Sequence, residues 1–503
     1  MKKRTKKVWK RTAAMALAVA MAATTVTGCG NKSSAKLNDG SFKEVDASTL
    51  EFPLKEKATL TGTISYPANT ESDPNKRTIF KRLQEKTNVE IDWTAIQADQ
   101  WSDKISLEMA NTKNMTDFIF SAGFSDNDLL KYAKQGVIIP LEEYIDAYMP
   151  NLQAVFEKYP EYRTMCTDTE GHIWALPWIE QLGNEKTAIQ TIGNMSFINK
   201  KWLDFLNLEV PTTVDEFEQV LIAFRDHASE IQAEFGIDGS IIPMSCIVND
   251  GDQDPSLIIN GFGEGYGDAD KTRHIAVTND KEVICSATQD GYKEGIEWLH
   301  KLYEEGLIDT ESFTQEWSTY VAKGKNHRYG LCFSWDIANI DNYEDYVMLP
   351  ALAGPEGLVN ITRQNSSETS GFDRGRCVLT SNCRDTALAA AWIDQMYNPI
   401  QSAQNNWGTY GEENSDNIFE MSTNANGEPM LRHMELSGKS PVEIRENQSV
   451  NGPLAILNEY YNVYVTEPDD AKWRLDNMHE TYLSDMNSKY VFPNVFMSIE
   501  DTN

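Results

Sequence analysis

The 503-residue chain is poor in positive charge, with 45 Lys and Arg against 76 Asp and Glu and a formal net charge of −31. Binding to nucleic-acid phosphates needs clustered cations, so this deficit argues against a nucleic-acid-binding protein. A strongly acidic surface keeps proteins soluble and apart, so we expect a monomer. A hydrophobic content of 41%, with 12 Trp, 20 Tyr and 19 Phe, excludes a disordered chain.

Cysteine is scarce, and its spacing is irregular. Six cysteines follow Cys29, and no Cys-x-x-Cys occurs. An even number leaves disulfides open, but a chain that can bury a large core needs no such staples. We therefore expect mostly unpaired, buried cysteines that pack as small hydrophobic side chains. Cys377 and Cys383 form the pair to test first for a disulfide.

The motifs of common enzyme classes are missing, among them His-Glu-x-x-His, the Walker lysine and Gly-x-Ser-x-Gly. The acidic run 250–254 begins like a calcium loop, but Pro255 stands at its sixth position and Gly261 at its twelfth. We interpret it as a solvated turn. The prediction is that the chain has no catalytic residue, metal or cofactor. With 76 Asp and Glu in the chain, paired carboxylates for glycoside hydrolysis remain an alternative, although no spacing singles out two of them.

No apolar run beyond the N-terminus is long enough to span a membrane. The N-terminus has the order of a secretory signal, with seven Lys and Arg in residues 1–11 and a small apolar stretch at 12–26. It closes with Val26-Thr27-Gly28-Cys29, which resembles the lipobox of bacterial lipoproteins. We expect cleavage before Cys29 and lipidation of that residue. Localisation at the extracellular face of the cell membrane would follow.

From residue 58 onward, strand and helix patterns alternate. Strand patterns cover 58–66, 89–93 and 117–120, and helical patterns follow at 73–86, 99–111 and 126–135. Three strand–helix units in a row predict the α/β fold class, with a mostly parallel sheet and helices on both faces. In such sheets ligands bind at the carboxyl ends of strands, which are followed here by the loops that hold Asn69, Trp101 and Phe124.

Four segments further along have a recognisable order and spacing. They are Gly136–Ile145, Gly171–Pro177, Phe197–Leu203 with Leu208–Thr213, and Leu302–Asp309. Behind a lipobox, they resemble the large solute-binding lipoproteins of bacterial ABC importers, mainly the carbohydrate-binding group, over most of residues 58–410. The resemblance implies a two-lobed periplasmic-binding-protein-like fold, in which a hinge joins discontinuous lobes and ligand binds between them. It also implies ABC permease subunits as partners.

The resemblance divides the chain as follows: signal peptide 1–28, flexible tether 29–57, lobe 1 from 58 to 176, lobe 2 from 177 to 365, a return to lobe 1 at 366–412, and a C-terminal part of lobe 2 at 413–503. Many relatives carry an acidic calcium loop before an Ile-Pro segment. Residues 232–239 lack its alternating carboxylates, so this site is not carried over. The chain stops without a closing helix, which would fit a truncated last lobe.

Aromatic side chains give the remaining signal for a site. Sugars pack their flat C–H faces on Trp and Tyr, while their hydroxyls need carboxylates and amides. Trp178 and Trp335 are the first candidates, because similar proteins place aromatic residues from these segments in the cleft. The further ligand-binding candidates are Asp336, Trp101, Trp407, Tyr410, Phe124 and Asn69. By contrast, Trp93, Trp202, Trp298 and Trp392 lie on strand or helix patterns and are expected in the core.

We predict a lipid-anchored binding protein that captures an oligosaccharide and delivers it to a permease, without being an enzyme. A surface glycoside hydrolase is one alternative, and new reducing ends on incubated oligosaccharides would reveal it. A binder of peptides or other solutes with the same fold is another. The sequence names neither the sugar nor its linkage and length.

The anchor prediction is tested at Cys29. Cys29→Ala should release the protein from the membrane fraction and leave its melting temperature unchanged, because the lipid hangs on a tether that adds nothing to the core. Fractionation after a salt wash measures this. A variant that still sediments with membranes would contradict the lipobox interpretation.

Overall fold

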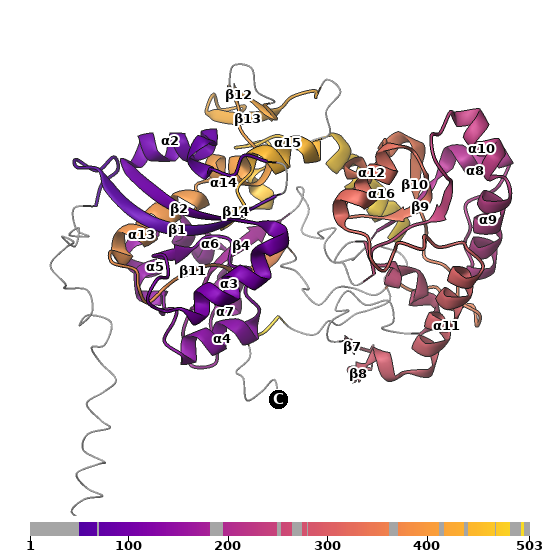
Figure 1. Cartoon of the computed structure of the whole chain (residues 1–503), viewed down its shortest axis with the longest axis horizontal. Coiled ribbons are helices and arrows are strands. Elements are labelled where there is room, and N and C mark those ends of the chain that lie inside the picture. The colour runs from indigo at the N-terminus through magenta and orange to yellow at the C-terminus, as the bar shows by residue number, and fades with distance from the viewer. Residues whose placement is uncertain are drawn as a thin grey trace, which may run out of the picture.

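The computed structural model describes residues 50–67, 70–181, 195–248, 253–263, 274–278, 280–361, 371–411, 417–436, 441–467, 469–482 and 494–496. These residues form two α/β lobes, which stand side by side in Figure 1. Each lobe has its own sheet and its own hydrophobic core. The two-lobed architecture predicted from the sequence is confirmed.

Lobe 1 is built on a six-stranded sheet of order β14-β4-β11-β3-β1-β2. Its strands are β1 (Ala58–Tyr66), β2 (Val89–Gln97), β3 (Phe118–Ile119), β4 (Leu176–Glu180), β11 (Phe372–Leu379) and β14 (Leu454–Ile456). β1 pairs in parallel with β2 and with β3, as the strand–helix units predict. β11 runs antiparallel to both β3 and β4 and joins the two halves of the sheet.

Helices cover both faces of this sheet. They are α2 (Thr78–Thr87), α3 (Trp101–Ala110), α4 (Asp126–Lys134), α5 (Glu142–Tyr148), α6 (Pro150–Lys158), α7 (Pro160–Cys166), α13 (Thr386–Asp394), α14 (Pro399–Trp407) and α15 (Pro441–Gln448). An aromatic cluster fills the core between sheet and helices, where Trp392 stacks on Phe118 at 5.7 Å and lies 6.3 Å from Trp93. The core position expected for these tryptophans is confirmed.

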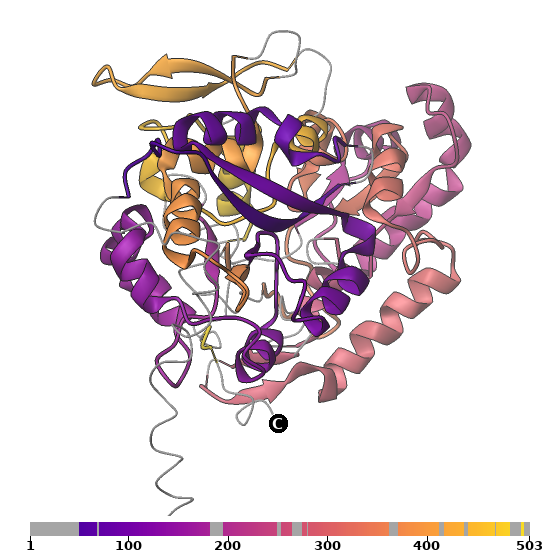
Figure 2. The ribbon, with the colours of Figure 1, turned by 60° about the vertical axis from the view of Figure 1, so that its left-hand side comes forward.

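A hairpin extends from lobe 1 beyond the six-stranded sheet. β12 (Phe419–Thr423) and β13 (Pro429–His433) pair antiparallel and stand above the body in Figure 2. The base of the hairpin is buried, because Phe419 and Leu431 pack with Ala403 of α14 and Ile456 of β14.

Lobe 2 is built on a four-stranded sheet of order β10-β5-β9-β6. Its strands are β5 (Ser196–Asn199), β6 (Ile242–Met244), β9 (Tyr329–Phe333) and β10 (Tyr346–Met348), and its helices are α8 (Lys200–Leu206), α9 (Val214–Asp226), α10 (Ala228–Phe235), α11 (Asp290–Glu304) and α12 (Trp317–Lys325). A small antiparallel pair, β7 (Ile275–Val277) with β8 (Val283–Cys285), precedes α11. Thr213 caps α9 by accepting from the Glu216 N–H, and the predicted apolar stripe of that helix is buried.

The C-terminal assignment is corrected by the structure. Most of 413–503 belongs to lobe 1, because the hairpin, α15 and β14 all pack there. Only α16 (Asp469–Tyr482) completes lobe 2, where Met478 is buried and the Tyr482 hydroxyl donates to the Leu349 carbonyl at 2.6 Å. Phe496 then lies in the core of lobe 1. The first crossing also falls later than predicted, since β4 is wholly part of the lobe 1 sheet.

The cysteines that the structure describes are free. Cys285 is exposed, and the other five, Cys377 and Cys383 among them, are buried. Burial raises the pKa of the Cys246 thiol to about 12, which keeps it protonated. Among the described residues, none of the helices has the length and apolar character of a membrane span. The signal, Cys29 and the tether to residue 49 lie outside the described residues.

Asp394 joins two helices of lobe 1 through a buried carboxylate. It ends α13 and is 1% exposed. Its oxygens accept from the backbone N–H groups of Asn151 at 3.2 Å and Leu152 at 3.0 Å, in the first turn of α6. Burial raises the pKa of the Asp394 carboxyl from 3.8 to about 6, although these hydrogen bonds oppose the rise. The folded protein therefore holds this proton more tightly than the unfolded chain does.

The free energy of unfolding should consequently fall as the pH rises from the unfolded pKa of Asp394 to its folded pKa. The contribution of Asp394 is fully present below the unfolded pKa of 3.8 and is lost as the pH rises through about 6. Asp394→Asn removes the titration, so the free energies of unfolding of wild type and variant should diverge by up to about 1.4 kcal/mol per pH unit. Urea unfolding from about pH 4 to about pH 7 measures this, with Asp146→Asn at an exposed ion pair as the control. Parallel curves for wild type and Asp394→Asn would refute the prediction.

Candidate functional site

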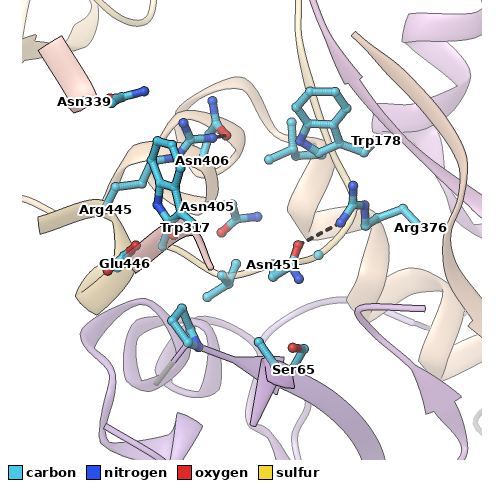
Figure 3. A pocket seen from close by; sticks show the side chains of 16 residues that line it. Ser65, Trp178, Trp317, Asn339, Arg376, Asn405, Asn406, Arg445, Glu446 and Asn451 are labelled. Carbon is cyan, nitrogen blue, oxygen red and sulfur yellow. Dashed lines mark hydrogen bonds between the residues drawn. The ribbon is translucent and has the colours of Figure 1, made fainter. Parts of the chain in front are cut away.

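A cavity of about 390 Å³ lies where the two lobes meet. Most of its lining comes from lobe 1, while Trp317 and Asn339 come from lobe 2 (Figure 3). A volume of this size lies within the range of small-molecule sites. Because both lobes contribute, the shape of the cavity depends on how the lobes stand relative to each other.

The lobe 1 wall begins at the carboxyl ends of parallel strands. Ser65 and Pro67 lie at the end of β1, and Ala98 follows β2. This is the sheet edge at which the sequence predicts ligand binding. The opposite part of the wall is formed by β4, β14 and the last turn of α14, which supply Trp178, Leu454 and Asn406.

Trp178 and Arg376 lie together because β4 and β11 pair irregularly. Asp373 is opposite Trp178, and the register shifts before Cys377 pairs with Leu176. Such irregularities re-aim side chains at sites, and here Arg376 lies in the shifted stretch. Its guanidinium is 5.8 Å from the Trp178 ring and donates to Asn451 Oδ1 at 2.7 Å. It also pairs with Asp373 at 2.9 Å, so its charge has a partner within the protein.

A second chain of polar contacts runs from β4 to α15. Glu180, which is 6% exposed, accepts from the Asn406 amide at 2.8 Å, and Asn406 Oδ1 accepts from Arg445 at 2.7 Å. Burial raises the pKa of the Glu180 carboxyl, while the Arg445 charge and the Asn406 hydrogen bond oppose this rise. Both arginines of the cavity are thus matched by acidic groups on the same lobe. Besides these two arginines and Glu446, the polar groups of the cavity are mainly amides, indoles and hydroxyls.

The lobe 2 side consists of the first residue of α12 and a short 3-10 helix, η7 (Ile337–Asn339). Trp317 and Asn339 extend from them into the cavity (Figure 3). η7 packs against α15 of lobe 1, next to Arg445 and Glu446. The two lobes are therefore in direct contact at the cavity.

Of the two leading sequence candidates, the cavity contains one. Trp178 lines it, half-buried, whereas Trp335 and Asp336 do not belong to its lining. Trp335 packs on the lobe 2 core with the Arg474 guanidinium 4.9 Å from its ring centroid. Asp336 is buried, pairs with Arg474 and caps η7 by accepting from the Ala338 N–H. Both residues hold α16 to lobe 2, an element whose contribution to this lobe no local pattern indicates.

The other aromatic candidates lie within lobe 1 and not in the cavity. Trp101 and Phe124 pack with Ile105 and Val378 in a side core. Trp407 contacts Phe419 of the hairpin, and Tyr410 stacks under Arg82 at 4.4 Å. Asn69 and Cys29 lie outside the described residues.

Sequence reasoning missed Trp317, Arg376, Arg445 and the asparagines of the cavity. Trp317 is the half-buried first residue of α12, and no local pattern distinguishes such a Trp from one that packs in the core, as Trp101 at the start of α3 does. No local signal marks Arg376 or Asn406, since each reaches the cavity through contacts with segments far away in the chain.

Comparison with known proteins identifies the family. The family model described as "Bacterial extracellular solute-binding protein" matches residues 58–362. This chain belongs to that family. The family and the fold predicted from the sequence are therefore confirmed.

Two curated relatives cover nearly the whole chain. The fructooligosaccharide ABC transporter substrate-binding protein FusA of Streptococcus pneumoniae is 41% identical over 477 residues, which are 95% of this chain and 85% of FusA. Lipoprotein LipO of Bacillus subtilis is 22% identical over 506 residues, with 97% and 89% covered. The first of them is named as a substrate-binding component of a transporter, not as an enzyme.

Solved structures agree with the family. S. pneumoniae FusA in complex with kestose has a TM-score of 0.80 and 41% identity, over 88% of this chain and 87% of FusA. A protein of Bifidobacterium longum infantis described as an HMO-binding, ABC-transporter-associated solute-binding protein has a TM-score of 0.65 and 23% identity, over 85% of this chain and 83% of that chain. The second likeness supports the fold alone.

Proposed function

We propose that this protein captures a fructooligosaccharide outside the cell and delivers it to the permease of an ABC importer. The interlobe cavity, with an indole from each lobe, carries the proposal. The 41% identity to FusA supports the sugar class, because it extends over 95% of this chain. The general assignment, oligosaccharide capture for an ABC importer, follows from the family; the fructan class is the finer proposal.

The chemistry of the cavity favours a neutral sugar. Trp178 and Trp317 offer flat apolar faces on which the C–H face of a sugar ring packs. Asn339 and Asn451 offer amides for hydroxyl groups, and Arg376 is already paired with Asp373. An anionic sugar would need an unmatched cation. A neutral fructan needs only stacking surfaces and hydrogen bonds.

Ligand capture would work through the relative position of the lobes. Lobe 1 supplies most of the cavity and lobe 2 covers it with Trp317 and Asn339. A ligand that touches both lobes binds the closed arrangement better than the open one, and this difference shifts the population toward closure. The permease subunits would then recognise the closed pair of lobes. Binding of this kind requires no bond to be made or broken.

The proposal includes where the protein acts. Lipidation at Cys29 would hold a monomeric body at the outer face of the cell membrane, on a tether long enough to let the lobes move. The hydrolase alternative remains open to the reducing-end assay. The peptide alternative is included in the ligand test below.

Kestose should stabilise the purified protein. A ligand at about 100 times its Kd raises the free energy of unfolding by about 2.7 kcal/mol, which appears as a higher melting temperature. Maltotriose is the matched control, being a neutral trisaccharide without fructose, and a tripeptide controls for the other solute class. A shift with the tripeptide or with maltotriose, but not with kestose, would overturn the fructan assignment.

Trp178 and Trp335 should separate binding from folding. Trp178→Ala removes a wall of the cavity, so kestose affinity should fall about 10- to 100-fold with little change in the ligand-free melting temperature. Trp335→Ala removes a packing partner of Arg474 and should cost up to about 3 kcal/mol of folding free energy at nearly unchanged affinity. Calorimetric titration and thermal unfolding measure both quantities. The opposite pattern would return Trp178 to the core and Trp335 to the site.

A further inference from the structure

Trp317 lies at the start of α12, a position that helix capping does not secure. The preceding residue, Glu316, makes no side-chain capping hydrogen bond to this helix. Trp317 is half-buried, and its ring lies 6.1 Å from that of Tyr320 in the next turn. A side chain that covers a ligand from the end of a helix needs some other contact to fix the helix.

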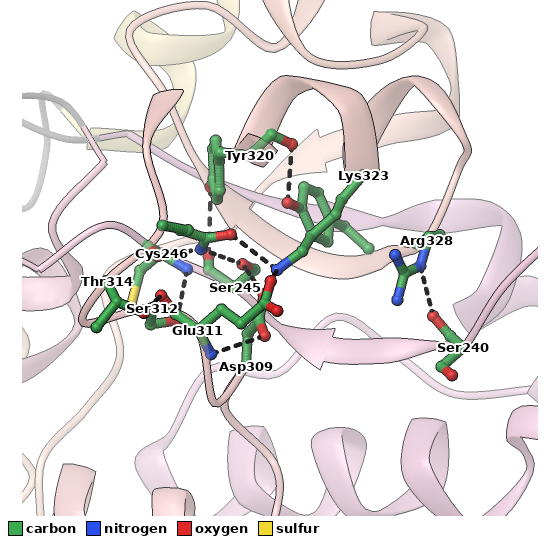
Figure 4. Close-up of polar contacts among 12 residues, drawn as sticks. Ser240, Ser245, Cys246, Asp309, Glu311, Ser312, Thr314, Tyr320, Lys323 and Arg328 are labelled. Carbon is green, nitrogen blue, oxygen red and sulfur yellow. Dashed lines mark hydrogen bonds and ion pairs between the residues drawn. The ribbon is translucent and has the colours of Figure 1, made fainter. Parts of the chain in front are cut away.

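That contact is a buried ionic network at the other end of α12 (Figure 4). The Lys323 ammonium pairs with Asp309 Oδ2 at 2.6 Å and with Glu311 Oε2 at 2.6 Å. The side chains of Lys323 and Asp309 are only 9% and 8% exposed. Burial of two charges is unfavourable unless they pair with good geometry. The pair therefore favours a single position of α12 relative to the loop that contains Asp309.

Gln315 connects the network to the turn that carries Trp317. Its Oε1 accepts from Lys323 Nζ at 2.8 Å, and its Nε2 donates to the Cys246 carbonyl at 2.7 Å and to Ser245 Oγ at 3.1 Å. Ser245 Oγ in turn donates to Asp309. These polar groups thus satisfy one another's hydrogen bonds. Gln315, which connects them, lies two residues before Trp317 in the chain.

Tyr320 secures the same helix on its inner side. Its hydroxyl accepts from the Phe333 N–H at 2.9 Å and donates to the Phe333 carbonyl at 3.0 Å, at the end of β9. α12 is therefore held by directional hydrogen bonds both before and after Trp317. Buried polar networks whose groups are all satisfied rigidify the elements that they join.

We propose that Gln315 and Lys323 are positioning residues that hold Trp317 in the ligand cavity. The inference rests on the proposed function, because it assigns the network to binding of the same sugar. Neither side chain belongs to the lining of the cavity. Ligand affinity would therefore depend on a buried lysine that the ligand never touches.

Gln315→Met is the first test, because it breaks the link to the turn and leaves the ion pairs of Lys323 intact. Kestose affinity should fall about 3- to 30-fold in this variant. In a Trp317→Ala background the same substitution should cause no further loss, since the residue through which it acts is gone. Lys323→Met should show the same dependence on Trp317, provided that it folds. Additive losses in the two backgrounds would overturn the proposal.

Phe224→Leu is the matched control for stability. Phe224 is fully buried in the lobe 2 core and makes no contribution to the cavity lining. This variant should lower the melting temperature and leave kestose affinity unchanged. If Gln315→Met behaved in the same way, the network would be structural only.

A ligand-independent measurement separates failure of the inference from failure of the proposed function. The protein is labelled with 5-fluorotryptophan, and the Trp317 fluorine signal is identified by its loss in Trp317→Phe. In Gln315→Met this signal should shift or broaden more than those of the other tryptophans. If the wild-type protein does not bind kestose, the fructan assignment fails. A Trp317 signal that changes in Gln315→Met would then still support the positioning role of Gln315. An unchanged signal refutes the positioning role whatever the ligand.

Discussion

The pairing of β4 with two strands from distant parts of the chain is the constraint on which the site depends. β11 lies against one edge of β4 and β14 against the other, so that Trp178 is opposite both Asp373 and Leu454. β4 and β11 are separated by about two hundred residues in the chain, and β11 and β14 by about eighty. All three strands nevertheless lie at one wall of the cavity. This strand pairing is what brings Trp178, Arg376 and Asn451 together in the cavity wall.

The same sheet explains how the two arginines of the cavity are matched by acidic groups. Arg376 extends from an irregular stretch of β11 and pairs with Asp373 of the same strand. Gly375 beside it allows the close approach of the Phe124 backbone, since a Cβ there would lie 2.0 Å from the Phe124 carbonyl oxygen. Glu180 at the end of β4 balances Arg445 through Asn406. Both arginines are matched within lobe 1, so movement of the lobes does not separate them from their acidic partners.

The two lobes contribute unequally, and this asymmetry fits a capture mechanism. Lobe 1 provides a nearly complete wall, while lobe 2 offers Trp317 and Asn339 from the ends of short helices. Each lobe has its own core, so one can move as a unit relative to the other. Precision on the lobe 2 side then depends on how firmly α12 is fixed, and this is the role that we propose for the buried Lys323 network.

The sequence by itself determined the local elements and the family. Alternating apolar patterns predicted β1, β2 and β3 with their helices, because each unit forms from contacts close in the chain. The edge of the sheet at which ligand would bind followed from the same pattern. Trp178 also followed, though through the family resemblance.

Tertiary structure alone decided which residues share the cavity and to which lobe the C-terminal segments belong. The short strand β14 has three residues, too few for a pattern, and its place beside β4 arises from hydrogen bonds to a partner far away. Trp335 and Trp178 are equivalent candidates in the sequence. In the fold, Trp335 is packed against the lobe 2 core and Arg474 of the C-terminal helix α16. In our proposal, Trp317 owes its position to α12, which the buried ion pair between Lys323 and Asp309 helps to fix. Such long-range contacts produce no periodic pattern in the sequence, because the residues around one partner do not indicate which distant segment will contact it.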